Sequence, residues 1–435
     1  MFDPVNEPSF RLDVAGLSDS FEVLGFNGRE AISEPFVFDV DLLIDDPTLD
    51  LARLLYRPVF LRFGPQGNGF HGLLHELVQR EHSSATRLCR ARLGPKLACL
   101  AQRFSQRIFS GRSVPDILDQ VLIEHGIVGK HRRFELSGDY PPRDFCTQYR
   151  ESDLQFLQRL CTHHRLHYHF EHGARGHCVV FADGQGHFPL GDRADFHAER
   201  EQPAVRQFEL LAEQLTSQRA EGRSDLPTLR SGQLMPLSDH PIVSCNHRWL
   251  LTHVEHQGTE DHYSNQIRAI HWTQPFVSSH SAEKPRMHSL QRAWVVDVNE
   301  QQPDSSRPVA VQFDWLYQGE GATASHCWLP LDAGLGAATV AQLSEGVEVV
   351  VSFIEGDPDQ PLITGFLHVP SPLEEAQAPR PTEDCPPVEG LLGLLRSGEP
   401  LSLLCLLPGG GSFSHCALAV CTCRVATRLG QSGAA

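Results

Sequence analysis

The chain lacks a surplus of positive charge, a long apolar run and a recognisable secretory signal. Lys and Arg number 37 against 54 Asp and Glu, a formal net charge of −17 at pH 7, which disfavours binding to nucleic acid or to an anionic membrane surface. No segment reaches the roughly 18 consecutive apolar residues that a membrane-spanning helix requires. Residues 1–4 (MFDP) begin no basic segment followed by an apolar run. We therefore expect no nucleic-acid partner, no membrane insertion and a cytoplasmic chain, at least when it is first made.

The short motifs of nucleotide-binding and hydrolytic enzymes are also missing. No GxxxxGK[ST] and no GxSxG string occurs, so neither a P-loop nor a nucleophile elbow is predicted. Residues 319–324 (GEGATA) fit a loose GxGxxA string, but an extended segment (CWLPL) follows at 327–331, where dinucleotide binding needs a helix N-terminus. A hairpin loop is the better interpretation. No cofactor and no catalytic residue are predicted.

The 12 cysteines do not suggest a disulfide framework. Seven are scattered singly between Cys89 and Cys327, and five crowd into the last 51 residues. Without a secretory signal, scattered cysteines are interpreted as reduced, small hydrophobic residues. Cys421 and Cys423 form a CxC pair that lacks a second ligand pair, so they are weak evidence for a metal.

Alternating apolar and polar residues predict β-structure in the first hundred residues. The alternation is clear at 10–14 and 36–42. Residues 59–63 and 70–75 flank a loop rich in turn formers (64–69, GPQGNG), which is typical of a hairpin. A barrel or a strongly curled antiparallel sheet is expected here.

Two helices are predicted next, and strands resume after them. Ser113 can cap a helix that runs to Gly126, and Ser152 can cap a second that reaches Cys161. Further strands are expected at 166–170, 178–181, 249–256, 263–271, 293–298, 309–315, 347–354 and 362–367. The strands after 293 suit a small five-stranded Greek-key barrel of the OB type. Residues 201–232 are polar and poorly periodic, so they are interpreted as a linker or a short helical connection.

The 24 histidines raise the question of a metal site. The densest group comprises Cys161, His163, His164, His167, His169, His172, His177 and Cys178. Zinc needs three or four N or S donors that converge at about 2.0–2.3 Å. His167 and His169 could share one face of a strand, but Tyr168 and Phe170 then fill the other face, as on an ordinary sheet. We favour a structural role and keep a His-rich metal-binding enzyme as an alternative.

A zincin-like string is present only superficially. His75 and Glu76 are followed by His82, seven residues after the first histidine and starting on a predicted strand. The helical His-Glu-x-x-His motif places both imidazoles one turn apart. This string is therefore not interpreted as a zinc site.

The most specific string in the chain is residues 347–365 (VEVVVSFIEGDPDQPLITG). Two apolar strands flank a rigid turn, in which a glycine supplies backbone freedom and prolines fix φ. The carboxylates of this turn are interpreted as caps for backbone amides. The residues singled out as a structural motif are Phe353, Glu355, Gly356, Asp357, Pro358, Asp359, Pro361 and Gly365.

This string resembles the closing hairpin of the OB domain in the VgrG family of type VI secretion spike proteins, with its F-x-E-G-D-P-D-x-P and I-T-G hallmarks. Other segments resemble the family in the same order. They are residues 28–36 (GREAISEPF), 107–109 (RIF), 113–118 (SVPDIL), 148–160 (QYRESDLQFLQRL), 240–241 (HP) and 309–315 (VAVQFDW). The resemblance covers about residues 8–369.

The resemblance implies a mainly β fold with α insertions, in which tandem β-barrels like those of a phage tail hub precede an OB-fold barrel and an irregular tail. The domains expected on this basis are 8–100 (first barrel), 101–200 (α+β segment), 201–232 (linker), 233–288 (part of the second barrel), 289–369 (OB domain) and 370–435 (irregular or disordered tail).

The sequence departs from the family pattern in three places. After Gly365 no repeating valine and glycine pattern predicts the needle, so a PAAR tip is not expected. Residues 201–232 lack the usual Tyr/Pro/Gly-rich stretch, and 304–309 (DSSRPV) lack the usual D-x-x-G-R-V turn. The change of composition after Val369 suggests a shifted reading frame or a degraded gene.

The function that the resemblance implies is structural. We expect a non-enzymatic hub or spike-base component that forms a homotrimer, contacts the Hcp tube and baseplate proteins, and can be exported through the type VI apparatus. The alternative is an effector carrier or adaptor that uses the tail from Pro370.

Overall fold

The computed structural model describes residues 10–46, 48–64, 68–82, 86–173, 175–199, 202–214, 217–259, 262–278, 283–298, 305–316, 326–335 and 343–368. The described residues all belong to one compact unit, Met1–Val369. The predicted irregular tail, the GEGATA string and the CxC pair lie outside the described residues. The predicted mainly β fold with α insertions is confirmed.

The first six strands close into a barrel. They are β1 (Arg11–Val14), β2 (Phe21–Ala31), β3 (Glu34–Ile44), β4 (Pro58–Arg62), β5 (Gly69–His82) and β6 (Arg87–Gly94). Their order is β1-β4-β5-β6-β3-β2, and pairing of β1 with β2 closes the ring. The predicted hairpin around residues 64–69 is the antiparallel pair β4–β5.

Strand β3 shows why this segment forms a barrel wall. Phe36, Phe38 and Val40 are almost fully buried, whereas Asp39 and Asp41 between and after them point outward, as the period of two requires. A Cβ atom at Gly28 on β2 would lie 2.0 Å from the ring of Phe38. Glycine is therefore needed there, because the barrel interior is filled with aromatic rings.

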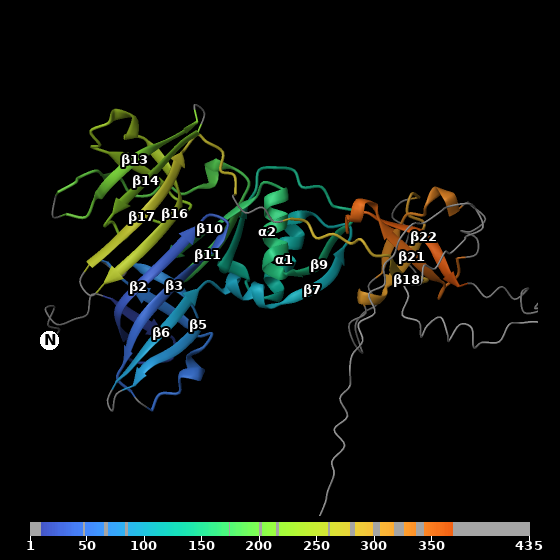
Figure 1. Cartoon of the computed structure of the whole chain (residues 1–435), viewed down its shortest axis with the longest axis horizontal. Coiled ribbons are helices and arrows are strands. Elements are labelled where there is room, and N and C mark those ends of the chain that lie inside the picture. Colours follow the sequence, from blue (N-terminus) through green and yellow to red (C-terminus); the bar gives the residue numbers. More distant parts are fainter. Residues whose placement is uncertain are drawn as a thin grey trace, which may run out of the picture. The chain divides into compact units, whose positions relative to one another are not determined.

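A second set of strands continues the same sheet (Figure 1). These strands are β12 (Ala194–Asp195), β13 (Val205–Gln214), β14 (Ser217–Ser224), β15 (Leu234–Ser238), β16 (Arg248–Thr259) and β17 (His262–His271). Strand β16 pairs with β2 of the first barrel, so the two curled sheets share one hydrogen-bonded seam. A bridge between Phe196 and Val205 brings the two ends of the second set together.

The predicted linker at 201–232 is wrong, because β13 and β14 form an antiparallel hairpin there. Val205, Phe208 and Ala220 face a core built around the fully buried Trp249. Register shifts between Val205 and Gln207, and between Leu211 and Gln214, interrupt the alternation. Bulges of this kind add a residue to one strand, which explains why the segment lacked a clear period in the sequence.

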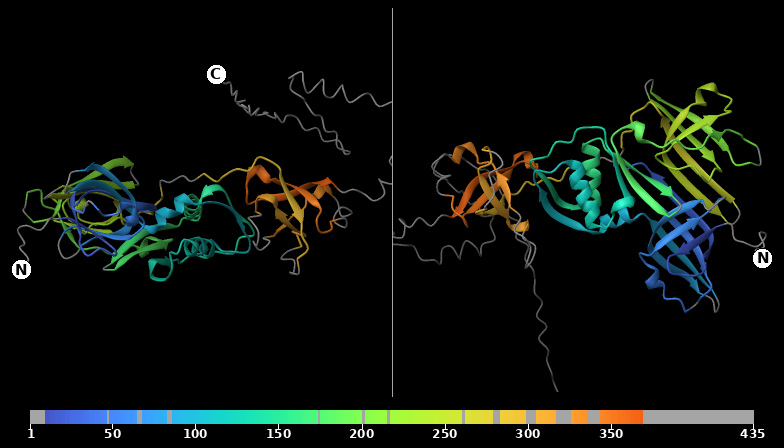
Figure 2. Two further views of the ribbon diagram at one scale, coloured as in Figure 1. Left: turned by 90° about the horizontal axis from the view of Figure 1, so that it is seen from below. Right: turned by 180° about the vertical axis from the view of Figure 1, so that it is seen from behind.

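Residues 96–182, which we call the central module, contain both helices. Its elements are η3 (Lys96–Gln102), β7 (Phe104–Phe109), α1 (Val114–Glu124), β8 (Arg132–Glu135), β9 (Cys146–Ser152), α2 (Asp153–His163), β10 (His167–Gly173) and β11 (Gly176–Ala182). Both predicted caps are confirmed as capping boxes, Ser113 with Asp116 and Ser152 with Gln155. The buried faces of the helices join the hydrophobic core of the first barrel, and the helices lie beside the β7–β9 pair (Figure 1 and Figure 2, right).

The last described strands form a five-stranded sheet, which we call the C-terminal sheet. Its strands are β18 (Gln291–Val295), β19 (Val309–Phe313), β20 (Cys327–Leu329), β21 (Glu348–Phe353) and β22 (Pro361–His368), in the order β20-β19-β18-β21-β22. A parallel bridge between Leu331 and Ile363 brings its two edges together.

Among the described residues, no helix is both long and apolar enough to cross a membrane. The seven cysteines in this part of the chain are all unpaired thiols, most of them buried. Burial raises the pKa of Cys146 to about 12, which keeps this thiol protonated and unreactive at neutral pH.

Candidate functional site

The predicted motif residues all lie in one hairpin, at the end of the C-terminal sheet that meets the central module. Phe353 ends β21 with its ring buried and stacked against Phe313, 6.3 Å between centroids. Pro361 opens β22 opposite Phe353. Gly365 pairs with Val350 next to a register shift in the same strand pair.

The turn between these strands needs unusual backbone angles. Glu355 has φ 53° and Gly356 has φ 74°, a left-handed conformation that glycine adopts without penalty. A Cβ atom at Gly356 would also lie 3.0 Å from Nδ1 of His288. Asp357 accepts a hydrogen bond from the backbone N–H of Asp359 at 2.9 Å, so this carboxylate caps an amide as expected from the sequence.

Asp359 reaches out of its own turn. Its Oδ1 accepts a hydrogen bond from the backbone N–H of Thr147 on β9 at 2.6 Å, across 212 residues of sequence. Its Oδ2 lies 2.7 Å from Nζ of Lys284 and 3.3 Å from Nη2 of Arg143. Nζ of Lys284 is also 2.5 Å from Oδ1 of Asp357. We call these five residues the junction.

The ion pairs of the junction lower the pKa of Asp357 and lie largely out of contact with solvent. Burial acts to raise the pKa of Asp357, but the hydrogen bond and charge of Lys284 outweigh it, and the pKa lies below its ordinary value. The side chain of Asp359 is 5% exposed, so its contacts operate with little screening by solvent. The hydroxyl of Thr147 adds a hydrogen bond to the carbonyl of Pro358 at 2.8 Å.

Apolar side chains of the central module continue the contact. Phe145 and Tyr149 are buried in the hydrophobic core of the C-terminal sheet, and the Tyr149 ring meets Trp315 edge-on at 6.1 Å. Strand β9 carries a register shift opposite Ser105 and Arg107, and Arg150 within it has φ 51°. A bulge redirects side chains, and here Tyr149 packs against the C-terminal sheet.

The string at 148–160 forms a buried ion network that sequence reasoning did not predict. Asp153, with no exposed side-chain area, accepts from Nε2 of His125 at 2.7 Å, Nε2 of Gln148 at 2.8 Å, Nε of Arg103 at 2.5 Å and Nη2 of Arg107 at 3.2 Å. Burial acts to raise the pKa of Asp153, but these partners hold it below its ordinary value. The aspartate at the start of α2 thus ties together α1, β7 and β9.

A second buried pair lies in the same string. The guanidinium of Arg159, 1% exposed, binds both carboxylate oxygens of Glu151 at 2.6 and 3.0 Å. It also donates to the carbonyl of Thr147 at 2.9 Å. The charged side chains Glu151 and Arg159 of this string therefore pair with each other inside the protein.

The predicted histidine group is packed among aromatic rings. The His167 ring stacks on Phe188 at 4.4 Å, and the His172 ring meets Phe70 edge-on at 4.4 Å. Burial lowers the pKa of His167 to about 3 and that of His177 to about 4. These histidines are therefore neutral in the folded protein at neutral pH.

The predicted group does not supply three donor atoms close enough to share one ion. Within the described ranges, three such atoms approach one another only at Asp195, His197 and Asp239. Nε of Arg193 lies 2.8 Å from Asp195, and Nη2 of Arg193 lies 3.3 Å from Asp239. This guanidinium already pairs with both carboxylates and offsets one of their two negative charges, so the group resembles an ordinary surface ion cluster.

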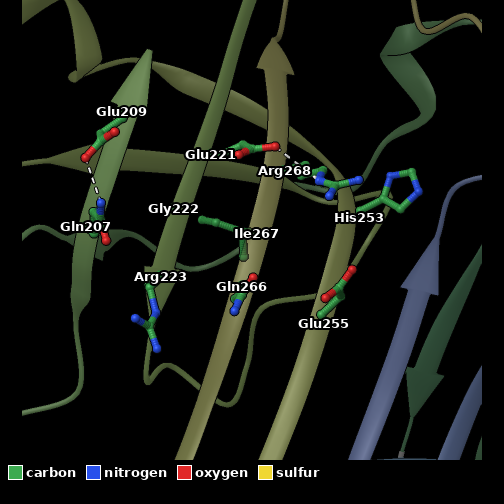
Figure 3. A pocket seen from close by; sticks show the side chains of 10 residues that line it. All are labelled: Gln207, Glu209, Glu221, Gly222, Arg223, His253, Glu255, Gln266, Ile267 and Arg268. Carbon is green, nitrogen blue, oxygen red and sulfur yellow. Dashed lines mark hydrogen bonds and ion pairs between the residues drawn. The ribbon is translucent and has the colours of Figure 1, made fainter. Parts of the chain in front are cut away.

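A depression of about 220 Å³ lies on the outer face of β13, β14, β16 and β17, with Gly222 at its centre (Figure 3). Its side chains pair with one another: Arg268 lies 3.2 Å from Glu221 on the neighbouring strand, and Gln207 donates to Glu209 on its own strand at 2.6 Å. Such cross-strand pairs are typical of a solvated sheet face.

The comparisons with known proteins agree with this architecture. Residues 29–199 match the family model of the phage tail baseplate hub (GPD). The type VI secretion system spike protein VgrG4b of Pseudomonas aeruginosa is 34% identical over the matched region, which covers 85% of this chain. The chain belongs to the VgrG family. A second VgrG protein of that organism, VgrG5, is also 34% identical over 85% of this chain.

Comparison with solved structures shows that the fold is shared with a known protein. A component of the type VI secretion system of E. coli, described as similar to the bacteriophage T4 tail proteins gp27 and gp5, aligns with a TM-score of 0.70 and 23% identity. The alignment covers 82% of this chain and 99% of that one. This VgrG-family chain spans 57% of the length of VgrG4b and 58% of that of VgrG5.

Proposed function

We propose that this chain is a structural hub or spike-base component of a type VI secretion apparatus. The observation that carries the proposal is the seam between β2 and β16, which joins a closed barrel to a second curled sheet in one hydrogen-bonded surface. Such a seam makes a rigid body, because every strand along it is paired on both sides. Rigidity is what a scaffold under mechanical load requires.

The C-terminal sheet is assigned here to the OB type. Its first strand, β18, pairs with both β19 and β21, and the bridge between Leu331 and Ile363 links the two remaining edges. A five-stranded, partly open Greek-key barrel has this connectivity. The VgrG-type hairpin at 347–365 supports the same assignment.

The proposed role is non-enzymatic. Groups with shifted pKa values such as Asp153 and His167 are buried in internal contacts and not in an open cleft. Catalytic groups need access to substrate as well as a shifted pKa. These groups instead hold the central module together.

The proposed partners follow from the family. They are two further copies of this chain in a homotrimer, the Hcp tube and baseplate proteins. The chain would be made in the cytoplasm and exported through the apparatus.

Light scattering on the purified chain tests the proposal. We expect a mass three times that of the 48.4 kDa chain, and co-sedimentation with assembled Hcp tubes but not with an unrelated filament. A strictly monomeric chain that does not co-sediment with Hcp tubes would refute the hub assignment.

A further inference from the structure

The C-terminal sheet does not complete its own core. Phe145 and Tyr149, which belong to the central module, are 7% and 8% exposed and contribute to the cluster that contains Val311, Phe313 and Val351. Aromatic residues of this size account for a large part of the apolar area in a small core. Removing the central module would therefore expose one end of the sheet.

The turn of the C-terminal sheet in return completes the central module. Strand β9 pairs with β7 on one side, and its other edge has no partner strand among the described elements. On that edge Asp359 accepts from the N–H of Thr147, and Arg159 donates to the carbonyl of the same residue. A buried backbone N–H on an unpaired strand edge is costly. The Asp359 carboxylate supplies the hydrogen-bond acceptor for the N–H of Thr147 on this edge.

The charges around Asp359 make this contact directional. Lys284 precedes the C-terminal sheet and Arg143 precedes β9, and both reach the same carboxylate oxygen. A carboxylate held by one backbone N–H and two cations has few alternative positions, because charge-assisted hydrogen bonds are short and geometrically demanding.

We propose that Asp359 is the positioning residue that fixes the C-terminal sheet on the central module, so that the two parts open and unfold as one cooperative unit. This inference deepens the scaffold role proposed above. A hub that already fixes its spike base within each chain would not depend on assembly to set that orientation.

Hydrogen exchange followed by mass spectrometry on the full chain tests the inference, with Asp359→Asn as the variant. This substitution keeps the shape of the side chain and removes its charge. We expect exchange to become at least about tenfold faster in peptides that cover 143–149 and, together with them, 347–366. Asp314→Asn is the matched control, since Asp314 forms an exposed ion pair with Arg292 at 3.3 Å in the same sheet and should leave β9 unchanged.

Two further variants keep the inference falsifiable if Asp359→Asn fails to fold. Lys284→Met should accelerate the same two sets of peptides, and Tyr149→Ala should accelerate exchange in the C-terminal sheet although its site lies on β9. Faster exchange confined to the peptide that carries each substitution would overturn the inference. These measurements do not depend on trimer formation. If the chain proves monomeric but the peptides covering 143–149 and 347–366 still respond together, only the hub assignment is refuted.

Discussion

The buried histidines make a quantitative prediction about acid. His167 is 6% exposed, stacks on Phe188 and has its Nε2 without a hydrogen-bond partner in the described part of the chain. Burial, with smaller contributions from His169 and His187, lowers its pKa from 6.5 to about 3. The unfolded chain therefore binds a proton below pH 6.5 that the folded chain does not bind until about pH 3.

The magnitude follows from linkage between protonation and folding. The stability due to this one histidine is intact above the unfolded pKa and is lost progressively as pH falls toward the folded pKa. Each pH unit costs about 1.4 kcal/mol. At about pH 5, which is about 1.5 units below the unfolded value, His167 alone should destabilise the fold by about 2 kcal/mol.

The assay is urea unfolding at about pH 7.5 and about pH 5 for the wild type and His167→Phe. Phenylalanine preserves the stacking on Phe188 and cannot be protonated. The free energy of unfolding should fall less between the two pH values in the variant, by about 2 kcal/mol. The exposed His262→Phe serves as the control and should follow the wild type. An identical pH dependence in His167→Phe and the wild type would refute the reasoning.

Three substitutions test other parts of the fold. Phe353→Asp places an unpaired charge in the core of the C-terminal sheet and should unfold that sheet, and normal circular dichroism and melting would contradict the inward placement of β21. Glu151→Gln strands the buried charge of Arg159 and should cost about 3–5 kcal/mol in urea titration, most of it regained in a double variant with Arg159→Met. Gly28→Ala forces a methyl group into the ring of Phe38 and should lower stability by about 1–3 kcal/mol, and an unchanged melting temperature would show that the barrel yields there.

Local signals predicted the elements that depend on local chemistry. The alternation at β3 and the caps at Ser113 and Ser152 gave correct strands and helices, because a pleat and a helix N-terminus are set by residues within a few positions. The hairpin β13–β14 was missed, since its bulges break the period and its outer face carries polar and charged residues such as Glu209, Glu221 and Arg223. Only pairing with β17 shows that this segment is a sheet strand.

The sequence by itself determined the strand pattern, the helix starts and the turn at 353–361. The tertiary structure decided which charges are buried together. Thr147 and Asp359 are 212 residues apart, and Arg103 and Asp153 are 50 apart. No local pattern pairs such residues, because the strength of a charge contact depends on the burial that distant segments provide. For that reason the carboxylate of Asp359 is interpreted from the sequence as a cap within its own turn, whereas in the fold it contacts the central module.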